Sequence, residues 1–111
     1  MAQFLRSSDA DGWLVVRVVG EIDLAVVDGL KAAVRPCLAE GRPVELDLSG
    51  LEFIDSSGLG ALVQLRNDAE RRGVSLRLRD MPPSMVRLFD ITGLAGVFDV
   101  VSTGNSDDAG A

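Results

Sequence analysis

The sequence contains no histidine, one cysteine and one lysine. Without histidine, the chain cannot form a Ser-His-Asp or Cys-His catalytic group or a histidine-based zinc site. A single cysteine, Cys37, excludes an internal disulfide and a cluster of thiolate metal ligands. A serine–lysine pair remains formally possible, but Lys31 falls within a predicted surface helix. We therefore expect a protein that is not an enzyme and that uses no metal or other cofactor.

Basic charge is also scarce: 11 lysine and arginine residues stand against 17 aspartate and glutamate residues, a net charge of −6. Nucleic-acid binding normally requires a basic face, so we expect no direct contact with nucleic acid. No apolar stretch approaches the roughly 20 residues that span a bilayer, and the N-terminus lacks the features of a signal peptide. Together with a lone cysteine, which suits a reducing compartment, these absences predict a cytoplasmic protein without direct membrane insertion.

The spacing of hydrophobic residues predicts strands and helices that alternate along the chain. Strands are expected near 3–8 and at 13–20, 44–48, 74–79 and 97–101, with a break at Ser49-Gly50 after the third. Helices are expected from 24 to about 40, from 55 to 73 and from 82 to about 91. The order β-β-α-β-α-β-α-β predicts an α/β fold with a mixed, mostly parallel sheet and helices packed mainly on one face. We expect one domain over residues 1–101 and a disordered tail at 102–111.

Three segments have a clear amphipathic pattern. Asp23 is expected to be the N-cap of the first helix. The apolar stripe of this helix is expected to consist of Leu24, Val27, Leu30, Val34 and Leu38. In the strand at 44–48, Glu45 and Asp47 alternate with apolar residues and are expected to point away from the core. Arg77 and Arg79, in the strand at 74–79, are expected on a solvated face.

The junction between the third strand and the second helix has the sequence Phe53-Ile-Asp-Ser-Ser-Gly-Leu-Gly60. Such turns are exposed in α/β sheets, so a serine there offers its hydroxyl to another molecule. An N-cap alone would explain one polar residue, but two serines exceed that need and two glycines weaken a first helical turn. Gly58 and Gly60 are expected to leave the backbone uncovered, so that another protein can approach closely. A phosphate-binding loop pattern is missing, which argues against a nucleotide site.

The segment Asp55-Ser-Ser-Gly-Leu-Gly60, following an apolar strand, resembles the motif of the STAS domain family, in particular of bacterial anti-sigma factor antagonists. Gly20-Glu-Ile-Asp23 resembles the family's first loop after a strand, and the strand at 44–48 has the expected position. Arg87-Leu-Phe-Asp-Ile-Thr-Gly-Leu94 resembles the family's second recurrent segment. The resemblance covers about residues 3–101 and departs from the family at the C-terminus, where a polar tail replaces a common final helix.

This resemblance implies a regulator that switches between partners. The unmodified protein would bind an anti-sigma factor that is also a serine kinase, and this binding would free the sigma factor. The kinase would then phosphorylate Ser56 and the complex would dissociate, until a serine phosphatase restored the protein. The residues expected at the partner contact are Asp23, Asp55, Ser56, Ser57, Gly58 and Leu59. Among them, Asp23 and Asp55 are equally well explained as N-caps, and Leu59 mainly as a core residue.

Two other functions fit the same sequence. A STAS domain can be a scaffold subunit of a signalling complex or an accessory subunit in lipid transport, binding a partner without a phosphorylation switch. A module that binds a small ligand, a nucleotide or a lipid, is the second alternative. A neighbouring gene for a kinase would favour the switch, whereas a transporter operon would favour the accessory subunit.

Overall fold

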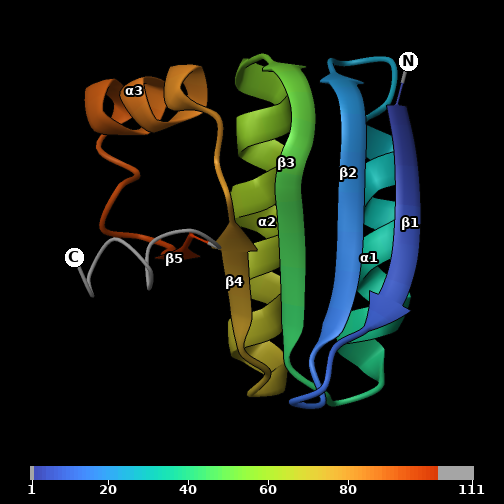
Figure 1. Cartoon of the computed structure of the whole chain (residues 1–111). Coiled ribbons are helices and arrows are strands. Elements are labelled where there is room, and N and C mark those ends of the chain that lie inside the picture. Colours follow the sequence, from blue (N-terminus) through green and yellow to red (C-terminus); the bar gives the residue numbers. More distant parts are fainter. Residues whose placement is uncertain (1, 103–111) are drawn as a thin grey trace, which may run out of the picture.

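The computed structural model describes residues 2–102, which form a five-stranded sheet and three helices (Figure 1). The strands lie in chain order: β1 (Ala2–Ser8), β2 (Leu14–Ile22), β3 (Val44–Ile54), β4 (Leu76–Arg79) and β5 (Asp99–Val101). The helices are α1 (Val27–Ala39), α2 (Ser56–Arg72) and α3 (Pro83–Thr92). β1 is antiparallel to β2, and every later strand is parallel to its neighbour. The predicted order and the mostly parallel sheet are therefore confirmed, whereas the predicted tail, apart from Ser102, lies outside the described residues.

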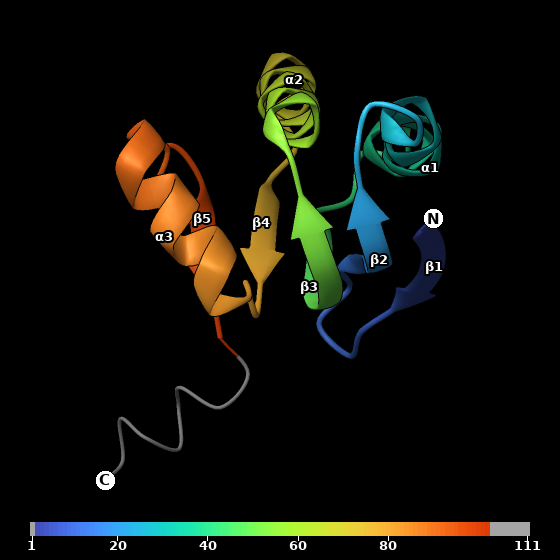
Figure 2. The same cartoon turned by 90° about the horizontal axis from the view of Figure 1, so that it is seen from above.

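Helices α1 and α2 pack side by side on one face of the sheet (Figure 2). Alternate side chains of β2 and β3 are buried beneath them, including Leu14 and Val16 at 1% exposure and Leu46 at 0%. The other face carries the polar residues of the same strands, as the alternation in sequence predicts. Within residues 2–102, no helix combines the length and the apolar character needed to cross a bilayer.

Local signals set most element ends, but β3 differs from the prediction. The expected break at Ser49-Gly50 is absent, and β3 continues to Ile54. Extra residues of β3 are accommodated as two shifts in its pairing with β2, one before Gly50 and one after Leu51. β3 therefore carries the chain to Asp55, beside the end of β2.

The open face of the sheet holds an ion-pair network around Glu45. This residue was expected to point away from the core, and it is nevertheless only 2% exposed. Its two carboxylate oxygens each lie 2.7 Å from a guanidinium Nε, one of Arg77 and one of Arg79. The Arg77 guanidinium in turn lies 3.7 Å from the ring centre of Trp13. The predicted direction of Glu45 is right, and its burial results from the arginines of β4, which cover it.

Candidate partner-binding site

The two segments that the sequence singled out meet at one edge of the sheet. Because β2 and β3 are parallel neighbours, their C-terminal ends lie side by side (Figure 1). A hydrogen bond of 3.1 Å from the Asp55 backbone N–H to the Ile22 carbonyl joins them. The fold therefore brings Asp23, which follows β2, close to Asp55 and Ser56, which follow β3.

Asp55 is the N-cap of α2. Its Oδ1 accepts a hydrogen bond from the Ser57 hydroxyl and another, of 3.1 Å, from the Gly58 backbone N–H. These bonds, with a smaller effect from the Leu24 backbone N–H, lower the pKa of Asp55 below its usual value. The carboxylate is therefore ionised at neutral pH and is directed at the helix start, which agrees with the capping role predicted for Asp55.

The two serines at this helix start have different surroundings. Ser57 is half-buried, and its hydroxyl donates to Asp55. Ser56 is exposed, and no other residue in the described range 2–102 is hydrogen-bonded to its hydroxyl. A modifying enzyme can therefore reach the Ser56 hydroxyl without breaking an existing contact, whereas reaching that of Ser57 would disturb the helix cap.

The two glycines of the first helical turn serve different purposes. A side chain at Gly58 would place its Cβ 2.5 Å from Cγ1 of Ile54 and 2.8 Å from Cγ2 of Ile22. Gly58 therefore faces the core and lets α2 pack closely on the strand ends, so its predicted role in leaving the backbone uncovered is wrong. Gly60 is exposed and has nothing within 4 Å of its Cβ position, as predicted. Leu59 is 7% exposed, so its side chain supports this surface from the core and is not available as a contact.

We predict opposite effects of alanine at the two glycines. In Gly58→Ala, overpacking against Ile54 should lower the free energy of unfolding by about 1–2 kcal/mol, even after the gain in helix propensity. In the matched variant Gly60→Ala, only the gain in helix propensity acts, and it should raise the free energy of unfolding by up to about 1 kcal/mol. Urea denaturation of both variants measures the difference, and equal stabilities would contradict the packing role of Gly58.

The prediction that Asp23 is the N-cap of α1 is wrong. The helix begins at Val27, with Val26 as N-cap and no side-chain cap bond. Asp23 instead closes a turn before the helix: its Oδ1 accepts from the Ala25 N–H, and its carbonyl accepts from the Val26 N–H, both at 3.0 Å. The buried stripe therefore starts at Val27, and Leu24 is 75% exposed. Sequence reasoning missed this exposed leucine because its spacing to Val27 is helical, whereas an aspartate turn competes with a helical first turn.

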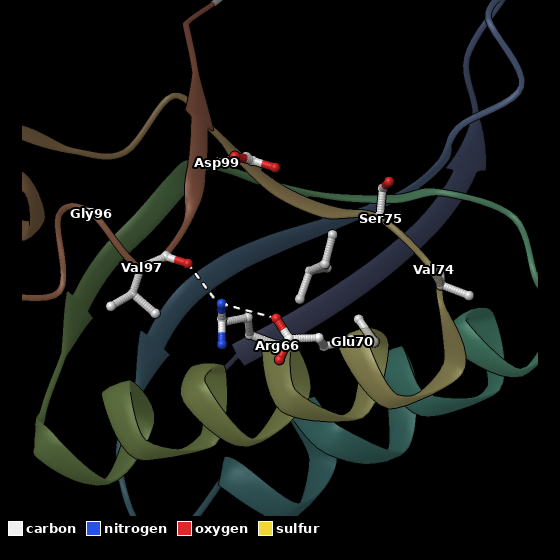
Figure 3. A pocket seen from close by; sticks show the side chains of 9 residues that line it. Arg66, Glu70, Val74, Ser75, Gly96, Val97 and Asp99 are labelled. Carbon is white, nitrogen blue, oxygen red and sulfur yellow. Dashed lines mark hydrogen bonds and ion pairs between the residues drawn. The ribbon is translucent and has the colours of Figure 1, made fainter.

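A pocket of about 320 Å³ lies at the opposite end of α2, bordered by that helix and the segments that lead into β4 and β5 (Figure 3). Arg66 extends into it, donates to the Val97 carbonyl at 2.9 Å and pairs with Glu70 at 3.1 Å. Its guanidinium is thus bound by groups of the protein itself. Within residues 2–102, no three His, Cys, Asp or Glu side chains are grouped to hold a metal ion. Neither Ser56 nor Asp23 lines this pocket, so the candidate site around Ser56 is separate from it.

Known proteins resemble this chain in both sequence and fold. A family model described as the STAS domain matches residues 6–106. The anti-sigma-B factor antagonist of Bacillus subtilis (strain 168) is 33% identical over 85 residues, 77% of this chain and 78% of that protein. The crystal structure of an anti-sigma factor antagonist from Mycobacterium paratuberculosis is 28% identical, with a TM-score of 0.79 over 91% of this chain and 86% of that one. The Bacillus cell fate determinant SpoIIAA, in its phosphorylated form, is 20% identical with a TM-score of 0.68 over 98% of this chain and 100% of that chain, a likeness of fold alone.

Proposed function

Because the chain belongs to the STAS domain family, we propose that it is an anti-sigma factor antagonist whose binding ends when Ser56 is phosphorylated. In its unmodified form it binds an anti-sigma factor with serine kinase activity, which releases the sigma factor. Phosphorylation of Ser56 by that kinase dissociates the complex, and a serine phosphatase restores the binding form. The protein acts as a competitor and a kinase substrate, not as a catalyst. Relatives named as antagonists, which match over most of both chains, support this role.

The observation that supports Ser56 as the switch is its exposed and unengaged hydroxyl at the start of α2. A phosphate adds roughly −1.5 to −2 charges at neutral pH. At a helix N-terminus, the exposed backbone N–H groups and the helix dipole favour such a charge, by about 0.3–1 kcal/mol. The fold should therefore survive phosphorylation, and the switch would act at the surface rather than by unfolding.

The surroundings of Ser56 explain why the same phosphate would oppose binding. Asp55 is ionised directly before it, and Asp23 lies at the adjoining strand end. A partner that covers Ser56 must remove water from the phosphate while two carboxylates are close by. We therefore propose Asp23 as an acidic contact for the partner and Asp55 as the residue that fixes the helix start.

A competition assay tests this function. The protein is added to a preformed complex of the sigma factor and the anti-sigma factor kinase from the same organism, without ATP. We expect the sigma factor to be released and a new complex between the protein and the kinase to form. A sigma factor that stays bound, with no binding of the protein to the kinase, would overturn the proposal.

A further inference from the structure

We propose that Leu24 is an apolar anchor for the same partner that binds around Ser56, and that this partner offers an apolar socket beside its contact with Ser56. The inference rests on the proposed function and adds to it a residue outside the serine motif. Leu24 is 75% exposed, whereas Val27, one helical turn later, is 8% exposed. The fold thus places the first leucine after β2 in solvent instead of in the core.

A single exposed leucine is common on protein surfaces, but Leu24 is held in place from both sides. Before it, the Ile22 carbonyl accepts the hydrogen bond of 3.1 Å from Asp55. After it, the carboxylate and the carbonyl of Asp23 hold the N–H groups of Ala25 and Val26, both at 3.0 Å. The backbone at Leu24 is therefore fixed before a partner arrives, and a preorganised contact loses less entropy on binding.

Asp55 links Leu24 to the switch. Its carboxylate caps α2 through Ser57 and Gly58, and its backbone N–H donates to the carbonyl of Ile22, two residues before Leu24. Leu24 and Ser56 therefore lie on two segments that Asp55 joins, one on the turn after β2 and the other on the first turn of α2. A kinase that phosphorylates Ser56 must bring its phosphate donor within bonding distance of the serine hydroxyl. The surface of the kinase would then also meet Leu24, on the adjoining turn.

Charge at this edge of the sheet defines the partner's surface further. Leu24 directly follows Asp23 in the chain, and the ionised Asp55 follows the adjoining strand β3. An exposed apolar side chain with two acidic residues at the same edge of the sheet fits a socket that is apolar at its centre and basic at its rim, because interfaces match apolar cores and opposite charges. We assign this surface to the kinase that acts on Ser56, since that partner has to cover this edge.

The test compares Leu24→Ala with Leu5→Ala, a matched change at a leucine of β1 that is 50% exposed and lies outside this edge. For Leu24→Ala, we expect the Kd for the anti-sigma factor kinase to rise about 10- to 100-fold, the effect of losing a buried leucine side chain. In phosphorylation assays its KM should rise while kcat stays unchanged, because the serine itself is intact. Leu24→Met should recover most of the affinity, and Leu5→Ala should bind like the wild type.

Thermal unfolding of each variant checks that the fold is kept, as expected for an exposed position. One result would overturn this inference and leave the proposed function standing: the wild-type protein binds the kinase and is phosphorylated on Ser56, and Leu24→Ala has a Kd and a KM within twofold of the wild-type values. A kinase that does not bind the wild-type protein at all would overturn both. The two failures are therefore distinct.

Discussion

Ser56→Asp is expected to weaken binding to the anti-sigma factor kinase by about 100-fold or more, which corresponds to a loss of about 2.7 kcal/mol or more. The substitution puts a second carboxylate directly after the ionised Asp55, at a place that the partner must desolvate. The helix N-terminus tolerates the added charge, so the free energy of unfolding should stay close to that of the wild type. Because aspartate carries less charge than phosphoserine, its effect should be smaller than that of the modification itself.

Isothermal titration calorimetry of three variants, each titrated with the kinase, separates the effect of the position of the added charge from the effect of net charge. Ser75→Asp is the matched control, because Ser75 is exposed and lines the pocket at the opposite end of α2. It adds the same charge and should change the Kd less than about twofold, since exposed charges far apart are screened by salt. Ser56→Ala should bind like the wild type and resist phosphorylation. Equal weakening by both aspartate variants, or none by Ser56→Asp, would contradict a local block at Ser56.

Glu45→Gln is expected to lower the free energy of unfolding by about 2 kcal/mol. The change keeps the shape of the side chain and removes the negative charge that Arg77 and Arg79 share, each through an Nε–O contact of 2.7 Å. Both guanidinium groups would then lose the counter-charge that they share, while Arg77 would keep its ion pair with Asp9 at 4.0 Å. Breaking a fully buried ion pair removes about 3–5 kcal/mol. The expected loss is smaller, because the two arginine side chains keep 21% and 29% of their exposure and water screens them.

Glu52→Gln is the control for this prediction, since it makes the same chemical change on the same strand at an exposed residue. It should alter the free energy of unfolding by less than about 0.5 kcal/mol. Urea unfolding, with the slope against denaturant checked for constancy, measures both variants. If Glu45→Gln were as stable as Glu52→Gln, the network on the open face would not contribute to stability.

The start of α2 was predictable from the sequence, because its signals are local. Asp55 stands directly before the helix as its cap, and Gly73 ends it with φ of 68°, a conformation that favours glycine. Parallel strands with helices between them then imply that the ends of β2 and β3 meet. The resemblance to the STAS family had placed Asp23 and Ser56 at one partner contact, and the structure shows that the strands before them end side by side.

Other features depended on contacts that the sequence does not specify. The role of Gly58 is set by the approach of Ile22 and Ile54 from two strands. Leu24 fits the helical period, and only the turn closed by Asp23 places it in solvent. These two errors share one cause. The spacing of residues along the chain does not reveal a contact with a distant segment or a competing turn, and such contacts decide whether a residue is buried.

Glu45 shows the same limit on the open face of the sheet. Acids alternate in β3 and arginines alternate in β4, so complementary charges could be seen in the sequence. Their pairing follows from the register that sets Glu45 beside Arg77, and register is a property of two strands together. Burial of a charged residue was therefore beyond a strand-by-strand prediction.

Mass spectrometry after incubation with the anti-sigma factor kinase and ATP tests the switch most directly. The protein is digested, the modified residue is located, and the amount of complex is followed in the same samples by gel filtration. We predict phosphate on Ser56, with loss of the complex in proportion to its occupancy, and none on Ser57, whose hydroxyl is engaged by Asp55. Phosphate found only on Ser57 or on another residue, or no phosphate at all, would contradict the proposed switch.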